Sequence, residues 1–315
     1  MPPYSLVKSS NDAYCPPYTP TVVVFGGTSG IGKAMAKRLG EQLQGRIHII
    51  IVGRNKAAAD DVFNSLPLPP AGDGDDDQDY VRKFVSCDLS LMKNLRKATE
   101  EISEIFPKIN YIIMTSGQAT FGRKRETEEG IDSQLVMRYY WKFAAINDLL
   151  PGLRAARDAG EAAGAFSVLG NGLGPKIDFN DLGGRKNHYL GVVPLIQGVV
   201  YGDLMLSMYA EKEHDIAFTH MYPGMVDTEA NSPAAFNFWL WKFFAALIIP
   251  LAWAFFIRVE VSAENMVYGL LSGEKGFYQR DTKANSVGPR NVNYTEEQKK
   301  FFWEHCLETT RSVPR

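Results

Sequence analysis

Residues 22–32, Val-Val-Val-Phe-Gly-Gly-Thr-Ser-Gly-Ile-Gly, constrain the fold more than any other stretch of the chain. Residues 22–25 are β-branched or aromatic and show no polar alternation, which predicts a strand buried on both faces. The glycines that follow have the spacing G-x-x-x-G-x-G and lead into a helix predicted over about 31–43. A strand, a glycine-rich turn and a helix in this order are typical of a dinucleotide site.

Each glycine of this turn has a predicted function. A Cβ at Gly26 would resist the tight turn, one at Gly30 would keep a pyrophosphate away from the backbone, and one at Gly32 would push the helix off the strand. The helix N-terminus would present free N–H groups to phosphates, and the hydroxyls of Thr28 and Ser29 would add donors. A glycine-rich turn without a ligand is the alternative. The predicted contacts here are Gly26, Thr28, Ser29, Gly30, Ile31 and Gly32.

Length and composition suit one large α/β domain or two small ones, and the absence of an internal repeat or a clear linker favours one. The chain has 315 residues, a formal charge of −2 and 45% hydrophobic residues, which is ample for a large core and gives no reason to expect nucleic acid as a partner. Its three cysteines are scattered without metal-type spacing, so we expect no metal site and a reducing, cytoplasmic compartment. The acidic run 73–77 lacks the regular spacing of a calcium loop and is interpreted as a surface loop.

Apolar strands alternate with helical segments along the rest of the chain. Further strands are predicted at about 47–52, 81–85, 111–114, 165–169 and 276–279. Helices are predicted at about 127–150, where Pro151 would end the helix, at about 261–271, and at about 295–309. Thr295 and Gln298 have the spacing of a capping box at the start of the last helix. This order predicts an α/β fold with one doubly wound, Rossmann-type parallel sheet and helices on both faces, formed by residues 21–315 after an N-terminal arm, 1–20.

The end of the second predicted strand bears on the choice of nucleotide. Arg54 follows it, about 20 residues after Gly32, where an acidic residue would bind the ribose 2′-hydroxyl of NAD and an arginine suits the 2′-phosphate of NADP. We therefore predict NADP(H) in preference to NAD(H), with a solvated surface arginine as the alternative. Asp88 follows the third strand and is predicted either to accept from the adenine amine or to cap the next helix.

Together these motifs resemble the short-chain dehydrogenase/reductase family. The glycine turn, Asp88, the Thr-Ser-Gly at 115–117 and the Tyr-Pro-Gly-Met-Val-Asp-Thr at 222–228 follow the family's order. The Tyr139-Tyr140 pair resembles a divergent subgroup common in fungal secondary-metabolite pathways. Residues 177–182 are similar to an insertion in retinol-dehydrogenase-like members. The resemblance implies these further cofactor contacts: Arg54, Asp88, Leu89, Ser116, Gly117, Pro223, Gly224, Val226 and Thr228.

The chain departs from the family at the residues that transfer the proton. Family members usually have a Ser, a Tyr-x-x-x-Lys helix and an Asn on the preceding long helix, and the lysine lowers the pKa of the tyrosine. No Tyr-x-x-x-Lys occurs between residues 186 and 215. Counted along the family pattern, the tyrosine position falls near residue 194 or 195, and the lysine position near Gly198 or Val199. The serine position falls at Gly170 or Asn171, and Arg138 stands where the family has the asparagine.

Four residues are candidates to replace this relay. Arg138 would face the nicotinamide, with Lys142 one turn further on the same helix face. Asn171 could donate an amide hydrogen to a substrate oxygen, and a tyrosine beside the two cations could titrate low enough to act as an acid. For each residue, an ordinary core or surface position is the alternative. The predicted catalytic residues are Arg138, Tyr139, Asn171 and Tyr189.

Residues 234–257 are almost wholly apolar. Their length would permit a membrane span, but Pro250 interrupts them and they follow the 222–228 motif, where the family has helices that close over substrate. We predict an apolar helical lid over about 229–260, after the sixth strand, that also touches a membrane surface.

The leading interpretation is an NADP(H)-dependent oxidoreductase that interconverts a ketone and an alcohol on a lipophilic, secondary-metabolite substrate. An isomerase or cyclase without a redox step, or a non-catalytic cofactor-binding protein, remains open because the relay is missing. The predicted partners are an apolar small molecule, a membrane surface contacted through 234–257, and a second copy of the chain in a homodimer, with no nucleic acid.

Overall fold

The computed structural model describes residues 2–69, 80–117, 125–183, 192–228 and 256–311. Within these residues, seven strands form one parallel sheet in the order β3-β2-β1-β4-β5-β6-β7, which confirms the predicted fold class. The strands are β1 Thr21–Phe25, β2 His48–Gly53, β3 Arg82–Ser86, β4 Tyr111–Met114, β5 Gly164–Val168, β6 Ala217–Met221 and β7 Gly276–Arg280.

The apolar run of β1 is explained by two hydrophobic cores, one on each face of the sheet. Val23 and Phe25 point into one core, and Val22 and Val24 point into the other. Every residue of the strand is buried, because a parallel strand in the middle of a sheet is covered on both sides.

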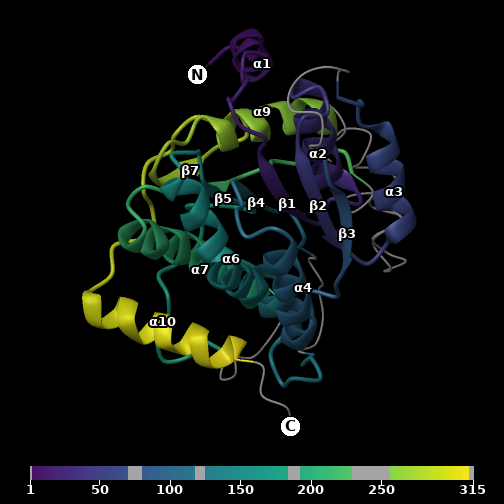
Figure 1. Cartoon of the computed structure of the whole chain (residues 1–315). Coiled ribbons are helices and arrows are strands. Elements are labelled where there is room, and N and C mark those ends of the chain that lie inside the picture. Colours follow the sequence, from purple (N-terminus) through teal and green to yellow (C-terminus); the bar gives the residue numbers. More distant parts are fainter. Residues whose placement is uncertain (1, 70–79, 118–124, 184–191, 229–255, 312–315) are drawn as a thin grey trace, which may run out of the picture.

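Helices cover both faces (Figure 1). The first core packs against α4, α6, α7 and α10, and the second against α2, α3 and α9. The helices are α1 Tyr4–Asp12, α2 Gly30–Gln42, α3 Lys56–Ser65, α4 Met92–Ile105, α5 Ser133–Leu135, the π-helix η1 Val136–Tyr140, α6 Trp141–Asp158, α7 Val192–Lys212, α9 Val259–Leu271 and α10 Glu296–Thr310. Thr295 and Gln298 form the predicted capping box of α10.

The strand order reverses between β1 and β4. The chain moves outward from β1 to β2 and β3, and then returns to place β4 on the other side of β1. In such sheets the crevice beyond the carboxyl ends of the two strands at the reversal is the usual ligand site. The glycine turn after β1 and the Thr-Ser-Gly after β4 therefore lie at the place where a dinucleotide would bind.

The predicted helix 127–150 is wrong at both ends. The helical run begins at Ser133, where the Asp132 side chain accepts from the N–H groups of Gln134 and Leu135. It passes through η1 into α6 and continues through Pro151 to Asp158. Proline removes one backbone donor, but the next turn is held because Leu153 and Ala156 are fully buried against the core.

The first residues of the chain form α1, which packs against α9. The buried Asn11 donates to the carbonyl and to the carboxylate of Glu264, at 2.9 and 2.7 Å. Arg38 of α2 binds the same carboxylate through two nitrogens. One buried carboxylate thus connects α1, α2 and α9.

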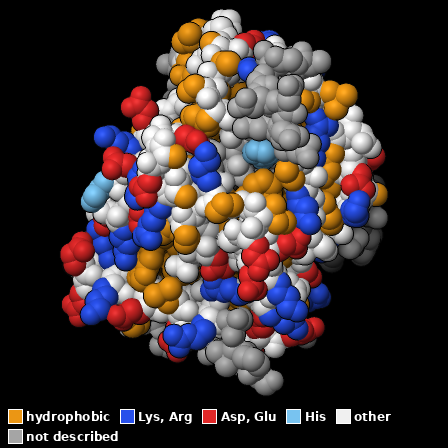
Figure 2. Space-filling model, in the orientation of Figure 1, with side chains coloured by type: hydrophobic (Ala, Val, Ile, Leu, Met, Phe, Trp, Pro, Cys, Tyr) orange, Lys and Arg blue, Asp and Glu red, His pale blue; other side chains and the backbone are white. Residues whose placement is uncertain are grey.

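Most of the predicted lid, residues 229–255, lies outside the described residues, as does most of the 234–257 stretch. The described end of that stretch returns to the sheet edge, where the Ile257 N–H donates to the Met225 carbonyl at 2.8 Å. Among the helices that are described, none has the length and apolar character needed to cross a bilayer. On the face shown in Figure 2, positive and negative side chains lie interspersed.

Candidate cofactor and active site

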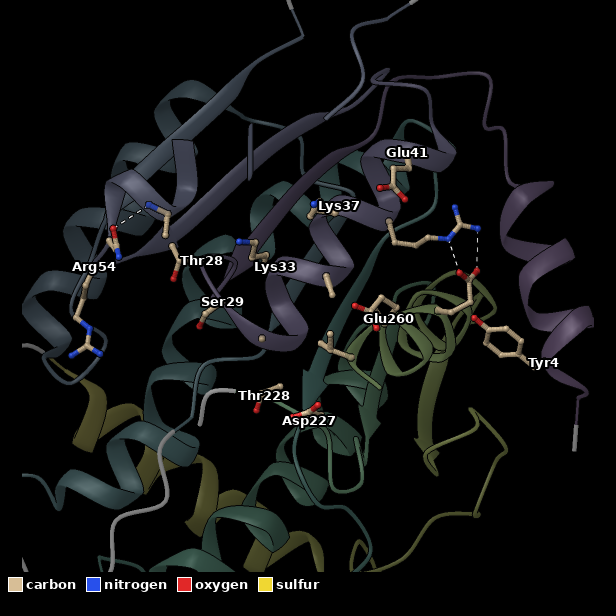
Figure 3. Close-up of a pocket in the computed structure, with 18 residues that line it drawn as sticks. Tyr4, Thr28, Ser29, Lys33, Lys37, Glu41, Arg54, Asp227, Thr228 and Glu260 are labelled. Atoms are coloured by element: carbon tan, nitrogen blue, oxygen red, sulfur yellow. Dashed lines mark hydrogen bonds and ion pairs between the residues drawn. The ribbon is translucent and has the colours of Figure 1, made fainter. Parts of the chain in front are cut away.

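A groove of about 860 Å³ opens at the amino end of α2. Thr28, Ser29 and Gly30 line one side of it, and Asp227 and Thr228 lie opposite. Figure 3 shows Arg54 at one end of this groove, next to Thr28. The groove thus joins the glycine turn, the end of β2 and the segment after β6, which are three of the sequence-predicted contact regions.

The glycine turn has the geometry that its spacing predicts. Gly26 has φ of 89°, and a Cβ there would lie 2.5 Å from Ser116 Oγ. Gly30 has φ of 53° and faces Thr228 across the groove. Ser29 is the N-cap residue of α2 and its side chain caps no N–H group of the helix. The first turn of α2 is therefore left to donate to a ligand.

Gly32 gives a testable prediction. A Cβ there would lie 2.4 Å from the Gly26 carbonyl oxygen and 2.4 Å from Thr115 Oγ1, so Gly32→Ala must push α2 away from β1. We expect a loss of about 1–3 kcal/mol in the free energy of unfolding, measured in urea. The control is Gly288→Ala, where φ is 73° but nothing lies within 4 Å of the added Cβ. Equal losses in the two variants would show that the α2 contact is not tight.

The residues after β2 and β3 include three of the predicted cofactor contacts, Arg54, Asp88 and Leu89. Arg54 is exposed and lines the groove, while the next residue, Asn55, caps α3 by accepting from the Ala58 N–H at 3.1 Å. Asp88 accepts from the Ser90 N–H at 3.0 Å in the turn before α4, so the predicted capping of the next helix is wrong. The first N–H groups of α4, those of Met92 and Lys93, instead donate to the carboxylate of Glu129. Leu89 is buried in the first core.

The residues after β4 fasten this strand to the glycine turn. Thr115 Oγ1 and the Ser116 N–H both donate to the Phe25 carbonyl, at 3.0 and 3.2 Å. Gly117 is exposed, and the nearest atom to a Cβ added there is the carbonyl oxygen of Met137 in η1, at 3.8 Å. The π-helix therefore borders the crevice beside β4.

Pro223 and Gly224 lead out of β6 into the last of the predicted contact segments. Gly224 has φ of 76°. Val226 is buried and forms a backbone bridge to Ile257, while Thr228 is partly exposed on the groove. The exposed side chains of Tyr222 and Met225 add apolar surface to this segment, which leaves the carboxyl end of β6 partly hydrophobic.

The structure places Tyr139 in the core, facing α10. Its side chain is fully buried and its hydroxyl lies 3.0 Å from Cys306 Sγ, while the Tyr140 hydroxyl lies 2.7 Å from His305 Nε2. Burial raises the pKa of both tyrosines well above their ordinary value. The hypothesis that nearby cations lower the pKa of one of them is wrong, and the geometry gives no support to Tyr139 as a proton donor.

Asn171 is likewise bound to backbone. Its Nδ2 donates to the carbonyls of His220 and Arg280, at 2.5 and 2.7 Å, so the amide joins the ends of β6 and β7. This leaves the predicted contact of Asn171 with substrate unsupported. Tyr189 lies outside the described residues.

A buried hydrogen-bonded pair, Asp203 and His220, holds the loop after β5, and sequence reasoning missed it. Asp203 of α7 and His220 of β6 are both fully buried, with Oδ1 and Nδ1 2.7 Å apart. The second oxygen of Asp203 accepts from the Gly172 N–H at 2.8 Å. A lone carboxylate within the apolar run 199–206 is the signal that could have found this pair.

Arg138 and Lys142 lie together near the carboxyl end of β5. Lys142 Nζ donates to Ser167 Oγ at 3.0 Å and to the Val168 carbonyl at 3.3 Å. Arg138 crosses α7 at Gly198, where an added Cβ would lie 2.8 Å from Arg138 Cβ. Arg138, at the position where the family has an asparagine, therefore contacts Gly198, near the position where the family has a lysine.

Comparisons with known proteins agree with this architecture. A family model described as short chain dehydrogenase matches residues 20–142. Oxidoreductase andH from the fungus Emericella variicolor is 30% identical over 270 residues, which cover 85% of this chain and 74% of that protein. The chain therefore belongs to the short-chain dehydrogenase family.

Two solved structures share the fold. A variant actinorhodin polyketide ketoreductase with NADPH is 14% identical, covers 88% of this chain and 98% of that chain, and has a TM-score of 0.56. The 3-ketoacyl-(acyl-carrier-protein) reductase from Brucella melitensis complexed with NADH is 17% identical, covers 85% and 99%, and has a TM-score of 0.57.

Proposed function

We propose that this protein is an NADP(H)-dependent oxidoreductase that interconverts a ketone and an alcohol on a lipophilic, secondary-metabolite substrate. The main observation is the cradle at the start of α2, where a Cβ at Gly26 or Gly32 would approach neighbouring atoms to within 2.5 Å. These glycines let β1, β4 and α2 approach closely, and no described side chain caps the N–H groups of the first turn of α2, as a pyrophosphate site requires. The ketoreductase with the same fold, which binds NADPH, supports a nicotinamide cofactor.

The bound dinucleotide would supply hydride chemistry, and this chain's residues would hold it. The first turn of α2 would bind the pyrophosphate, and Arg54 would bind a 2′-phosphate at the end of β2. Leu173, Tyr222 and Met225, near the carboxyl ends of β5 and β6, are exposed apolar side chains. These exposed apolar side chains support a substrate with a large apolar part, because exposed apolar groups that cluster at one place often mark a binding surface.

The preference for the phosphate is tested at Arg54. In Arg54→Gln we expect NADPH affinity to fall about 10- to 100-fold, since a charge-assisted hydrogen bond contributes about 1.5–3 kcal/mol, while NADH affinity stays constant. Fluorescence titration of each reduced nucleotide measures both affinities. Arg311→Gln, an exposed arginine beyond α10, is the control. An equal fall in the affinities for NADPH and NADH would contradict a contact between Arg54 and the 2′-phosphate.

The missing Tyr-x-x-x-Lys favours one alternative, a non-redox isomerase or cyclase on the same scaffold. Product mass separates the two functions, because reduction adds two hydrogens and isomerisation adds none. A panel of apolar ketones mixed with NADPH under anaerobic conditions tests the oxidoreductase directly. Loss of nicotinamide absorbance is the expected result, and its absence across the panel together with an unchanged product mass would favour the alternative.

A further inference from the structure

The groove at the start of α2 has a basic wall, formed by Lys33, Lys37 and Arg54. All three side chains line the groove, and Figure 3 shows Lys33 between the other two. Within the described residues, no ion pair or side-chain hydrogen bond involves any of these three cations. Arg54 has a role in the proposed function, so the two lysines are the charges that remain to be explained.

The two lysines point to the same side of α2. They are four residues apart, which places them on one stripe of the helix. Arg38, the residue after Lys37, is turned by about 100° around the helix axis and binds Glu264 of α9 instead. In Figure 3 the ammonium groups of both lysines point toward the end of the groove where Arg54 lies.

The carboxylates at the other side of the groove are paired or lie away from the basic wall. Glu264 and Glu260 are each paired with an arginine, Arg38 and Arg258 respectively. Asp227 lies on the opposite side of the groove, as Figure 3 shows. These three carboxylates therefore do not neutralise the basic wall.

Lys33 is better placed than Lys37 to hold an anion. It is partly exposed on the groove and lies in the first turn of α2, where the side chain of Ser29 caps no N–H group. Glu41 follows Lys37 by four residues on the same stripe of the helix. It therefore offsets the charge of Lys37 more than that of Lys33.

The charge of a phosphate monoester fits two cations better than one. Such a group carries about −1.5 to −2 charges at neutral pH, so a single exposed arginine does not balance it. Arg54 follows β2 and Lys33 belongs to α2, yet both line the same cavity. Two cations from different elements can thus contact one phosphate from two sides.

We propose that Lys33 is a second specificity-determining residue for the 2′-phosphate of NADP(H), which it binds together with Arg54. This inference rests on the proposed function and extends it, because selectivity then depends on a side chain of α2 as well as on the end of β2. The phosphate would lie between a guanidinium and an ammonium group, and each would donate charge-assisted hydrogen bonds to its oxygens. Lys37, one turn further along α2, acts only at longer range.

The test compares adenosine 2′,5′-bisphosphate with adenosine 5′-monophosphate, which lacks only the 2′-phosphate, in calorimetric titrations of the full chain. We expect the wild-type chain to bind the bisphosphate at least about 100-fold more tightly, and Lys33→Gln to reduce this ratio about tenfold. The double variant with Arg54→Gln should bring the ratio to about one. Lys33→Arg keeps the charge and should retain most of the preference.

Two further lysines separate a direct contact from a general effect of charge. Lys37→Gln should reduce the ratio by less than about threefold, because its charge lies further from the phosphate and is screened by salt. Lys97→Gln, at an exposed position of α4, should leave the ratio unchanged. All the substituted side chains are at least partly exposed, so circular dichroism should show an unchanged fold in each variant.

The outcomes distinguish this inference from the proposed function. An equal fall in the affinities for both nucleotides in Lys33→Gln would assign the lysine to the 5′-phosphate and overturn the inference, as would an unchanged ratio. A ratio that falls in Arg54→Gln but not in Lys33→Gln overturns the role of Lys33 and leaves the proposed function standing. A wild-type chain that binds neither nucleotide contradicts the proposed function itself.

Discussion

Asp203→Ala is expected to lower the free energy of unfolding by about 2–4 kcal/mol, because it removes the acceptor of two hydrogen bonds, one of them to a fully buried imidazole. The substitution leaves His220 Nδ1, which is fully buried, and the partly buried Gly172 N–H without their acceptor. His220 Nε2 has no hydrogen-bond partner even in the wild type, so the ring has no other described contact to replace the lost one. Urea unfolding followed by circular dichroism measures the loss.

Two variants give this prediction its control. Asp203→Asn keeps one acceptor oxygen and removes the charge, so it should cost less, about 1–2 kcal/mol. Asp61→Ala removes an exposed carboxylate of α3 and should change stability by less than about 0.5 kcal/mol. A loss below about 1 kcal/mol in Asp203→Ala would mean that the pair does not hold the loop after β5.

Six of the seven described strands could be placed because each carries a local signal, whereas no range is predicted for β6, Ala217–Met221. The run before the glycine turn is apolar at every position, and both cores of the structure use it, with Val23 on one side and Val24 on the other. The capping box of α10 is equally local, since Thr295 and Gln298 are three residues apart. Such features depend on neighbours in the sequence, so spacing alone identifies them.

The long helix shows where local signals fail. Pro151 is a strong local stop, yet α6 continues because Leu153 and Ala156 are buried by packing that the local sequence does not reveal. The start of the helical run depends on the side chain of Asp132, which offers an alternative to continuing the helix toward residue 127. Burial against the core therefore sets the end of the helical run, and the Asp132 cap sets its start.

The candidate active site could be predicted only in part, because its contacts join distant segments. Arg138 and Lys142 could be placed on one helix face from their spacing. The contact between Tyr139 and Cys306 spans 167 residues, and the one between Asn171 and Arg280 spans 109. Those contacts give Tyr139 and Asn171 partners within the fold that residue type alone does not reveal.

Lys142 gives the second large effect, an unusual dependence of stability on pH. In the unfolded chain the lysine keeps its proton up to about its ordinary pKa of 10.5, while in the folded chain burial lowers the pKa to about 7. Between these values unfolding takes up a proton, so the stability of the wild-type chain rises with pH. From about pH 6 to about pH 9 this group should add about 3 kcal/mol to the free energy of unfolding, and Lys142→Met should remove that gain.

The variant should therefore be more stable than the wild type at about pH 6, where the buried ammonium is charged, and the two should converge toward pH 9. Lys97→Met, at an exposed position of α4, should follow the wild-type curve throughout. Parallel curves for wild type and Lys142→Met would show that the lysine titrates alike in both states. If the curves converge, the chain keeps a destabilising buried charge on α6 next to the carboxyl end of β5, an arrangement expected where stability is lost in favour of function.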